Sequence, residues 1–355
     1  MAQSSAIVAQ EIQTVGPVKT YTERLPDDRF VTASISEKLP EGARVDLPPL
    51  ILDGTQVIQR LTDRTYWIAY GSHMQTVFVG DKGVLLVDAP VVTTPDKIIA
   101  AVAQITDLPI RALVLSHPHT DHNGMAAPLR DALKAQAIDL RIITSEQGLV
   151  EIRRYRSLPE PTQVLPNGRA TFFFEDFEFV YATPVRWAHT GSDSYTITPD
   201  GVITFIDFVY PGALPFQNVS VVQNLTGYLE FVRHVAGEPG WVYANLGHAN
   251  VGNREDVMRT LEYFKDLYTN WVRVIGPKAH EPYPGEQGVT NAAVALKTYF
   301  DRAAEELANS MKEKWGTVPQ FEVVRDHATE VHKDMYLNYA AWLGAMPEFT
   351  PIEPQ

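Results

Sequence analysis

The sequence predicts an α/β protein in which helices are layered on a β-sheet. Residues 94–106 and 125–137 carry apolar residues at helical spacing, and Pro95 suits the first turn of the earlier helix. The short apolar runs 112–115 and 141–144 predict buried strands. Strands and helices that alternate at this spacing are typical of layered α/β folds.

The same patterns predict the remaining elements. Strands and their turns are expected at 56–61, 65–70, 75–80, 84–90, 170–175, 177–181, 194–198, 202–206 and 241–246. Helices are expected at 225–235, 253–268, 290–315 and 328–344. The prolines and weak periodicity near the N-terminus predict an extended arm over residues 1–54. A main domain is then expected over 55–285 and a helical extension over 286–355.

The amino-acid composition favours a globular enzyme and argues against other classes of protein. An apolar fraction of 45% with 21% charged residues is typical of a globular enzyme. A net charge of −13 argues against nucleic acid as a partner, because such binders usually present a basic face. The absence of cysteine removes disulfides, thiolate ligands and a cysteine nucleophile. We therefore expect a small-molecule substrate.

The sequence also bears on location. There is no run of 18 apolar residues, so no membrane span is expected. Residues 1–15 lack the basic segment of a signal peptide. A cytoplasmic protein is expected, or a periplasmic or secreted one if a leader has been removed.

A cluster of metal-binding side chains follows the strand predicted at 112–115. It comprises His117, His119, Asp121 and His122, and Gly124 comes next. Buried polar groups need partners, and a divalent metal can satisfy three imidazoles and a carboxylate together. His117 and His119 would face one side of extended chain, whereas Asp121 and His122 can reach a second ion. Zinc suits these ligands first, with manganese, iron or cobalt as alternatives.

The order His-x-His-x-Asp-His resembles the signature of the metallo-β-lactamase superfamily, and the resemblance extends over about residues 55–280. It implies an αββα sandwich with metal ions at the sheet edge. It also implies one ion on His117, His119 and His189, and a second on Asp121, His122 and His248. Asp207, at the end of the strand 202–206, would bridge the two ions together with a hydroxide. Asp88, which ends Leu85-Leu-Val-Asp88, would support the motif loop from outside the ligand set.

This ligand set implies a dinuclear hydrolase in which a metal-bound hydroxide attacks a lactone or a carboxylic ester, and Asp121 orients that hydroxide or moves its proton. Tyr210 has the spacing from Asp207 found in N-acyl-homoserine lactone lactonases, where a tyrosine stabilises the oxyanion; the alternative is a packed aromatic ring. Phe208, Leu214 and Phe216 are expected to form an apolar lip around the substrate.

The positions of the other histidines in the sequence predict where they lie. His73, on an early loop, is expected at the pocket rim and His280 is a further rim candidate, whereas His234, His327 and His332 are expected on the surface of helices.

Four alternatives stay open. The same ligands could cleave a phosphotriester or a β-lactam, although Asp207 counts against the β-lactamase subclass that lacks a cysteine ligand. A mononuclear iron dioxygenase of the persulfide dioxygenase type would share the ligands. A non-catalytic binding protein would be expected to have lost some of them.

Aromatic residues of the two C-terminal helices could pack on the sandwich or support a homodimer.

Overall fold

Two β-sheets form the centre of the computed structural model, which describes residues 29–47, 56–156, 158–217, 219, 222–278 and 291–336. Within these residues the first sheet has seven strands, in the order β3 (Gln56–Arg60), β4 (Thr65–Tyr70), β5 (His73–Val79), β6 (Val84–Val87), β7 (Ile110–Val114), β8 (Arg141–Ser145) and β9 (Gln163–Leu165). Strands β3 to β6 are antiparallel, and β6 to β9 run parallel.

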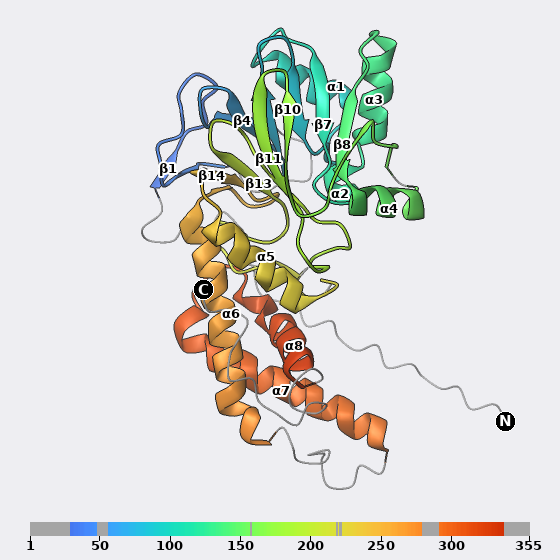
Figure 1. The fold of residues 1–355 in the computed structure, drawn as a ribbon. Coiled ribbons are helices and arrows are strands. Elements are labelled where there is room, and N and C mark those ends of the chain that lie inside the picture. The colour runs from blue at the N-terminus through green and yellow to red at the C-terminus, as the bar shows by residue number, and fades with distance from the viewer. Residues whose placement is uncertain are drawn as a thin grey trace, which may run out of the picture.

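The second sheet is mainly antiparallel. Over the described part of the chain its six strands are ordered β10 (Arg169–Phe174), β11 (Phe177–Ala182), β12 (Tyr195–Ile197), β13 (Val202–Phe205), β14 (Tyr243–Asn245) and β15 (Val251–Gly252). The pair β13 and β14 is parallel. The two sheets lie face to face (Figure 1), and one apolar cluster joins them through Phe78, Val87, Val114, Phe172, Phe179 and Tyr181.

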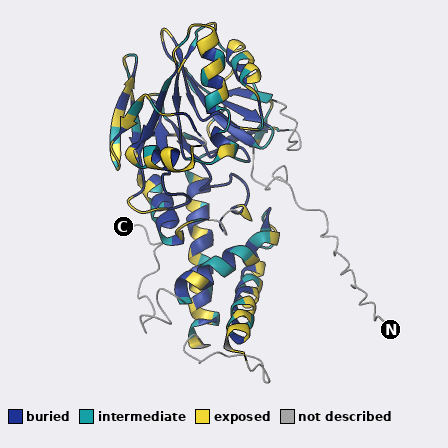
Figure 2. Cartoon of the chain, turned by 90° about the vertical axis from the view of Figure 1, so that its right-hand side faces the viewer, coloured by how far each residue is buried: buried dark blue, intermediate teal, exposed yellow. Residues whose placement is uncertain are grey.

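Helices cover the outer face of each sheet. Helices α1 (Pro95–Ala103) and α3 (Ala126–Ala135) pack on the first sheet through residues such as Ile98 and Leu129. Helices α5 (Leu225–Gly237) and α6 (Arg254–Val274) pack on the second sheet through Leu229 and Phe264. Buried residues accordingly concentrate in the strands and along the inner sides of these helices (Figure 2). The predicted αββα sandwich is confirmed.

The C-terminal helices extend the core around α6. Helices α7 (Ala292–Trp315) and α8 (Val324–Met335) pack against the part of α6 that reaches beyond the sheets (Figure 1). A short 3-10 turn, η2 (Gly276–Lys278), follows α6, and another, η3 (Phe321–Val323), precedes α8. Among the residues placed in the structure, no helix combines the length and apolar character needed to span a bilayer.

The described part of the N-terminal arm contains two short strands. Strands β1 (Arg29–Val31) and β2 (Ala43–Val45) pair in parallel, and Leu39 and Val45 pack against Trp67. A buried ion pair of 2.9 Å between Arg44 Nη2 and Asp256 Oδ1 holds the arm to the first turn of α6. This ion pair anchors the described part of the arm, residues 29–47, to the domain.

Several boundaries differ from the sequence prediction. Helix α6 continues to Val274, because Tyr268 and Trp271 extend its buried side against the C-terminal helices. Helix α4 (Glu146–Tyr155) and strand β9 were not predicted: α4 buries few residues, and β9 is only three residues long. Helix α2 (Thr120–Asn123), a single turn, carries part of the histidine motif.

The prediction of surface positions for His327 and His332 is wrong. Both side chains are fully buried, whereas His234 is exposed as predicted. The hydroxyl of Tyr263 lies 2.8 Å from Nδ1 of His327, and the indole N–H of Trp271 donates to Nδ1 of His332 at 2.9 Å. A neutral His327, whose ring nitrogens both have hydrogen-bond partners, can be buried at little cost.

Candidate metal centre

The site forms where parallel strands of both sheets end. In the first sheet, Asp88 follows β6 and His117 follows β7, and these strands are parallel neighbours. In the second sheet, Asp207 follows β13 and His248 follows β14, which are also parallel neighbours. Carboxyl ends of adjacent parallel strands meet at one edge, so the sandwich brings four segments of the chain together there.

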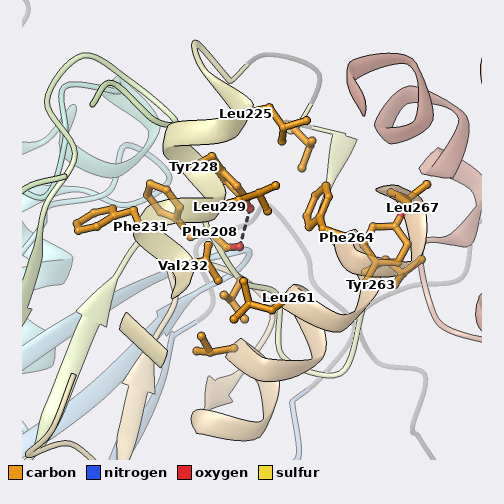
Figure 3. Close-up of a cluster of buried hydrophobic side chains, with 14 of the residues drawn as sticks. Phe208, Leu225, Tyr228, Leu229, Phe231, Val232, Leu261, Tyr263, Phe264 and Leu267 are labelled. Atoms are coloured by element: carbon orange, nitrogen blue, oxygen red, sulfur yellow. Dashed lines mark hydrogen bonds between the residues drawn. The ribbon is translucent and has the colours of Figure 1, made fainter. Parts of the chain in front are cut away.

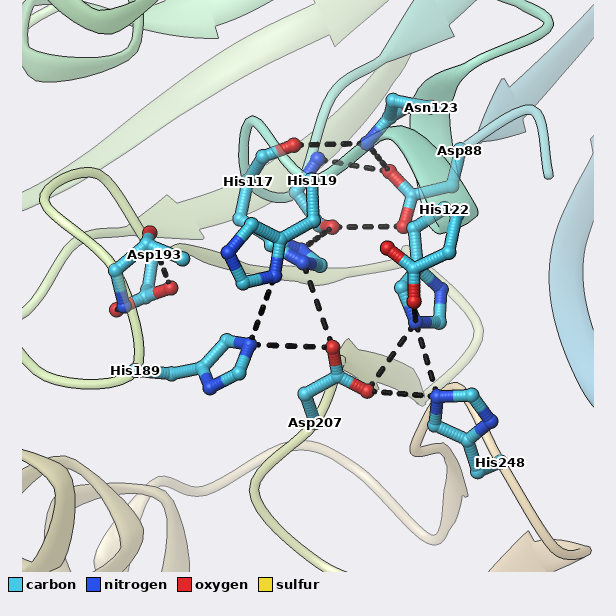
Figure 4. A network of polar contacts seen from close by, with 12 residues as sticks. Asp88, His117, His119, His122, Asn123, His189, Asp193, Asp207 and His248 are labelled. Atoms are coloured by element: carbon cyan, nitrogen blue, oxygen red, sulfur yellow. Dashed lines mark hydrogen bonds and ion pairs between the residues drawn. The ribbon is translucent and has the colours of Figure 1, made fainter. Parts of the chain in front are cut away.

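The first group of donor atoms comprises His117, His119, His189 and Asp207. Nε2 of His189 lies 3.1 Å from Nδ1 of His119. Oδ2 of Asp207 lies 3.4 Å from Nε2 of His117 and 3.3 Å from Nε2 of His189 (Figure 4). The three histidines that the sequence assigned to one ion therefore converge, together with Asp207, the predicted bridge.

The second group comprises His73, Asp121, His122 and His248. Nε2 of His122 lies 3.1 Å from Nε2 of His248 and 3.5 Å from Oδ2 of Asp121. The other oxygen of Asp207 faces this group, because its Oδ1 lies 3.2 Å from His122 Nε2 and 3.0 Å from His248 Nε2. The sequence placed His73 at the pocket rim, whereas the structure places it within this group.

The arrangement of the donor atoms is better suited to binding metal ions than to hydrogen bonds between the side chains. Nε2 of His117 and Oδ1 of Asp207 are buried and find no hydrogen-bond partner among the described residues. Donors around an ion with bonds of about 2.0–2.2 Å lie roughly 2.9–3.6 Å apart, which matches the separations in both groups. Imidazole nitrogen and carboxylate oxygen are ligands that zinc and related divalent ions accept.

Charges within the site are strongly coupled. Burial alone would raise the pKa of Asp207, but the surrounding imidazoles, His122 and His248 foremost, hold it well below its ordinary value. Burial lowers the pKa of His122, yet the Asp207 carboxylate outweighs burial and raises that pKa to about 9. Burial dominates at His117 and lowers its pKa to about 3. Asp207 is therefore ionised at neutral pH and can bind cations.

A buried hydrogen-bond chain fixes the ring of His117. The backbone N–H of Ser116 donates to Asp88 Oδ1 at 2.8 Å, and its hydroxyl donates to Asp88 Oδ2 at 2.7 Å. The Ser116 hydroxyl can therefore accept from Nδ1–H of His117, 2.8 Å away, which leaves Nε2 free to bind a metal. Asn123 donates to Asp88 Oδ1 at 2.9 Å as well. Burial raises the pKa of Asp88 to about 6.

Two polar residues beside the ligands were missed from the sequence. Ser116 carries the chain just described, and Asp193 stabilises the loop of His189. Asp193 accepts hydrogen bonds from the Thr190 backbone at 2.8 Å and from the Thr190 hydroxyl at 2.7 Å (Figure 4). Its position three residues after Thr190, within His-Thr-Gly-Ser-Asp, was a signal for such a turn.

The predicted substrate residues lie in different environments. The ring of Tyr210 is nearly parallel to that of His248, with centroids 5.8 Å apart. Phe216 is 45% exposed and stays a candidate for the apolar lip. Phe208 and Leu214 are buried, so the prediction that they line a pocket lip is wrong. Residue 280 lies outside the described residues.

Phe208 belongs to the aromatic core of the second sheet. Its ring stacks on Phe205, at 4.3 Å between centroids, and on Tyr228, at 4.7 Å. The Tyr228 hydroxyl also donates to the Phe208 carbonyl at 2.5 Å (Figure 3). Because both faces of its ring are stacked against other aromatic rings, Phe208 packs in the core next to Asp207.

Comparisons with known proteins bear on the family and the fold. Residues 70–168 match the family model of the metallo-beta-lactamase superfamily. A comparison with curated proteins finds no match. Among solved structures, a metallo-beta-lactamase from Pontibacter korlensis is 13% identical with a TM-score of 0.47, covering 59% of this chain and 98% of its own.

Two further solved structures are similar. VMB-1 is 17% identical with a TM-score of 0.48, covering 58% of this chain and 95% of its own. A double mutant of the sec-alkyl sulfatase PisA1 is 15% identical with a TM-score of 0.52, covering 83% of this chain and 52% of its own. This chain thus spans about half the length of that sulfatase, and the likeness concerns the fold. Residues 70–168, which include the histidine motif, are therefore similar to the metallo-beta-lactamase superfamily, and the αββα sandwich agrees with this likeness.

Proposed function

We propose that the chain is a dinuclear metal-dependent hydrolase that opens a lactone or a carboxylic ester. The family-model match over residues 70–168 and the two His/Asp groups support a metal-dependent hydrolase. The observation that carries the dinuclear assignment is the position of Asp207. Each of its oxygens faces a different group, at 3.0–3.2 Å from His122 and His248 and at 3.3–3.4 Å from His117 and His189.

The ligand residues would divide between two ions, of which zinc is the first candidate. His117, His119 and His189 would hold one ion, and Asp121, His122 and His248 the other. When bound, such ions supply Lewis acidity and lower the pKa of a bound water to about 7. The chain then has to position that water and the substrate, and to exclude competing bulk water.

Asp121 is suited to orient the attacking water. Its side chain is 45% exposed, whereas the histidines beside it are largely buried. One of its oxygens faces His73 and His122, at 3.4 Å and 3.5 Å from Nε2 of each ring. A carboxylate that touches both the ligand group and solvent can accept a hydrogen bond from the nucleophile and pass its proton outward.

Tyr210 and Phe216 support an acyl substrate. Tyr210 is stacked beside His248, so its hydroxyl could donate to an oxyanion that develops next to the second group. The two aromatic rings lie 6.4 Å apart, and Phe216 is partly open to solvent. Tyr210 is itself buried, so Phe216 supplies the exposed apolar surface for an acyl chain or an aromatic ester.

Other reactions share the same ligands and must be separated by experiment. A phosphotriester or a β-lactam could be attacked by the same nucleophile. A sulfate ester is a further candidate substrate, because PisA1 is named a sec-alkyl sulfatase. A mononuclear iron dioxygenase of the persulfide dioxygenase type would instead consume oxygen in the presence of a thiol.

The test is a substrate panel with the zinc-loaded protein. Proton release is followed with homoserine lactones, simple lactones, aryl esters, a phosphotriester and a sec-alkyl sulfate, and a cephalosporin is followed by its absorbance. Fast turnover of lactones or esters, abolished together with metal content in His119→Ala, supports the proposal. Turnover of another class alone, or thiol-dependent oxygen uptake with iron, would replace it.

A further inference from the structure

His73 has a fixed position at the tip of the β4–β5 hairpin. Tyr70 pairs with His73 across the turn, and Gly71 adopts a φ of +59° that favours glycine. His73 is only 8% exposed. A histidine in a tight turn between two paired strands has little freedom to move, which sets it apart from a mobile loop residue.

The hairpin is tied to the loop of His248 by two hydrogen bonds. The backbone N–H of Met74 donates to the Gly247 carbonyl at 3.0 Å. Nδ1–H of His248 donates to the Ser72 carbonyl at 2.7 Å, which leaves Nε2 of His248 to face the site. The ring of His73 consequently lies close to that of His248, with centroids 4.6 Å apart.

The second nitrogen of His73 faces the other donors. Its Nδ1 lies 2.9 Å from the Ser72 hydroxyl, so that nitrogen has a partner. Its Nε2 lies 3.4 Å from Oδ2 of Asp121. This separation is long for an N–H···O hydrogen bond, which is usually about 2.9 Å. It falls within the roughly 2.9–3.6 Å expected between donors around one ion with bonds of about 2.0–2.2 Å.

We propose that His73 is a direct protein ligand of the second metal ion, beside Asp121, His122 and His248. Donor atoms of these four residues all lie within 4.8 Å of one another. The inference rests on the proposed dinuclear function and deepens it. With Oδ1 of Asp207, the second ion would have five protein donors, whereas the first would have four.

The alternative is that His73 only donates a hydrogen bond to Asp121. His73→Gln separates the two roles, because glutamine keeps an N–H donor near Asp121 but is a poor metal ligand. His73→Ala removes both roles. His234→Gln is the matched control, since His234 is an exposed histidine on α5 away from both ligand groups.

The experiment titrates metal-free protein with Co²⁺ and follows the visible spectrum, the metal content and the exchangeable imidazole N–H signals shifted by cobalt. Wild type and His234→Gln are expected to bind two ions. In His73→Gln and His73→Ala the second ion should bind more than about 100-fold more weakly, beyond the effect usual for residues outside a ligand set. One shifted N–H signal should also disappear. Added imidazole should restore the second ion to His73→Ala, and circular dichroism checks the fold.

The outcomes separate the two proposals. If wild type binds two ions and His73→Gln binds both as tightly with an unchanged spectrum, His73 is no ligand and only this inference falls. If wild type binds fewer than two ions, the dinuclear function falls, and the role of His73 falls with it.

Discussion

Oδ1 of Asp207 lies 3.0 Å from Nε2 of His248, although 41 positions separate the two residues along the chain. They meet because β13 and β14 are parallel neighbours and each residue follows the end of its strand. Asp207 has a φ of +70°, which directs its carboxylate between the two histidine groups. Its other oxygen lies 3.3 Å from His189, so one side chain joins donors from both sides of the site.

Asp207→Asn should therefore weaken both metal sites. The amide keeps the size of the carboxylate but loses the negative charge and one acceptor oxygen. We expect metal affinity and turnover to fall by at least about 100-fold, more than changes outside a ligand set usually cause. Metal analysis and kcat/KM measure this. Asp200→Asn is the control, because Asp200 accepts hydrogen bonds from Thr65 and Thr198 in a turn cluster; equal metal loss in both variants would contradict the bridge.

Tyr210→Phe should slow turnover without changing metal content. Tyr210 stacks beside His248, and phenylalanine keeps the stacked ring while it removes the hydroxyl. If the hydroxyl stabilises an oxyanion, kcat should fall by about tenfold to a thousandfold. Steady-state kinetics on the best lactone or ester measure this, and metal analysis is the control. Wild-type kinetics in this variant would reduce Tyr210 to a packing role.

Gly247→Ala should distort the second metal site. Gly247 has a φ of +89°, and an added Cβ would lie 2.7 Å from Cγ2 of Ile206 and 3.1 Å from Cε1 of His122. We expect a loss of about 1–3 kcal/mol in the free energy of unfolding, together with weaker binding of the second ion. Denaturant unfolding and metal titration measure the two effects.

Gly240→Ala is a matched control for this prediction. Gly240 has a similar φ of +86°, but its added Cβ would meet no atom within 4 Å. Both alanines carry the backbone strain of a positive φ, whereas only the one at position 247 contacts a proposed ligand. Metal binding that is equal in the two variants would show that the contact with His122 has no consequence.

The sequence predicted those site residues that are close together along the chain or that follow an apolar strand, and it missed the role of a residue that reaches the site only through folding. His117, His119, Asp121 and His122 lie in one short segment, and Asp207 and His248 follow apolar strands, so their patterns are visible in the chain. His73 meets Asp121 only through contacts between the hairpin and the His248 loop, which no local pattern encodes. Its place in the second group therefore required the structure.

Burial of polar residues on helices was harder to predict. His332 lies on a helix with charged neighbours, which indicated a surface position. It is buried because Trp271 of α6 donates to its Nδ1 and Phe300 of α7 packs on its ring, with centroids 4.4 Å apart. Such partners come from distant segments, so the amphipathic pattern of a single helix does not reveal them. The same holds for the end of α6, which depends on packing with α7 and α8.

His327 should make stability depend on pH. Its Nε2–H donates to the Phe216 carbonyl at 3.1 Å, so Nδ1 accepts from the Tyr263 hydroxyl and the ring is neutral. Burial lowers the pKa of His327 from 6.5 to about 4. Below pH 6.5 the unfolded chain binds a proton that the folded protein excludes. The stability from this side chain is thus present above pH 6.5 and is lost as the pH falls toward 4.

His327→Gln isolates this effect, because glutamine does not titrate. The variant should be less stable than wild type at pH 7, where it lacks the two hydrogen bonds made by the imidazole. Between pH 7 and pH 5 the difference in unfolding free energy should shrink by about 2 kcal/mol, since only wild type has this proton to take up on unfolding. Urea unfolding of both proteins at the two pH values measures the change. The metal-site histidines are common to both proteins, so their titration cancels in the difference. A gap that stays constant with pH would mean that folding leaves the pKa of His327 unchanged, as for an exposed side chain, and a gap that widens toward pH 5 would mean that His327 is charged in the folded protein.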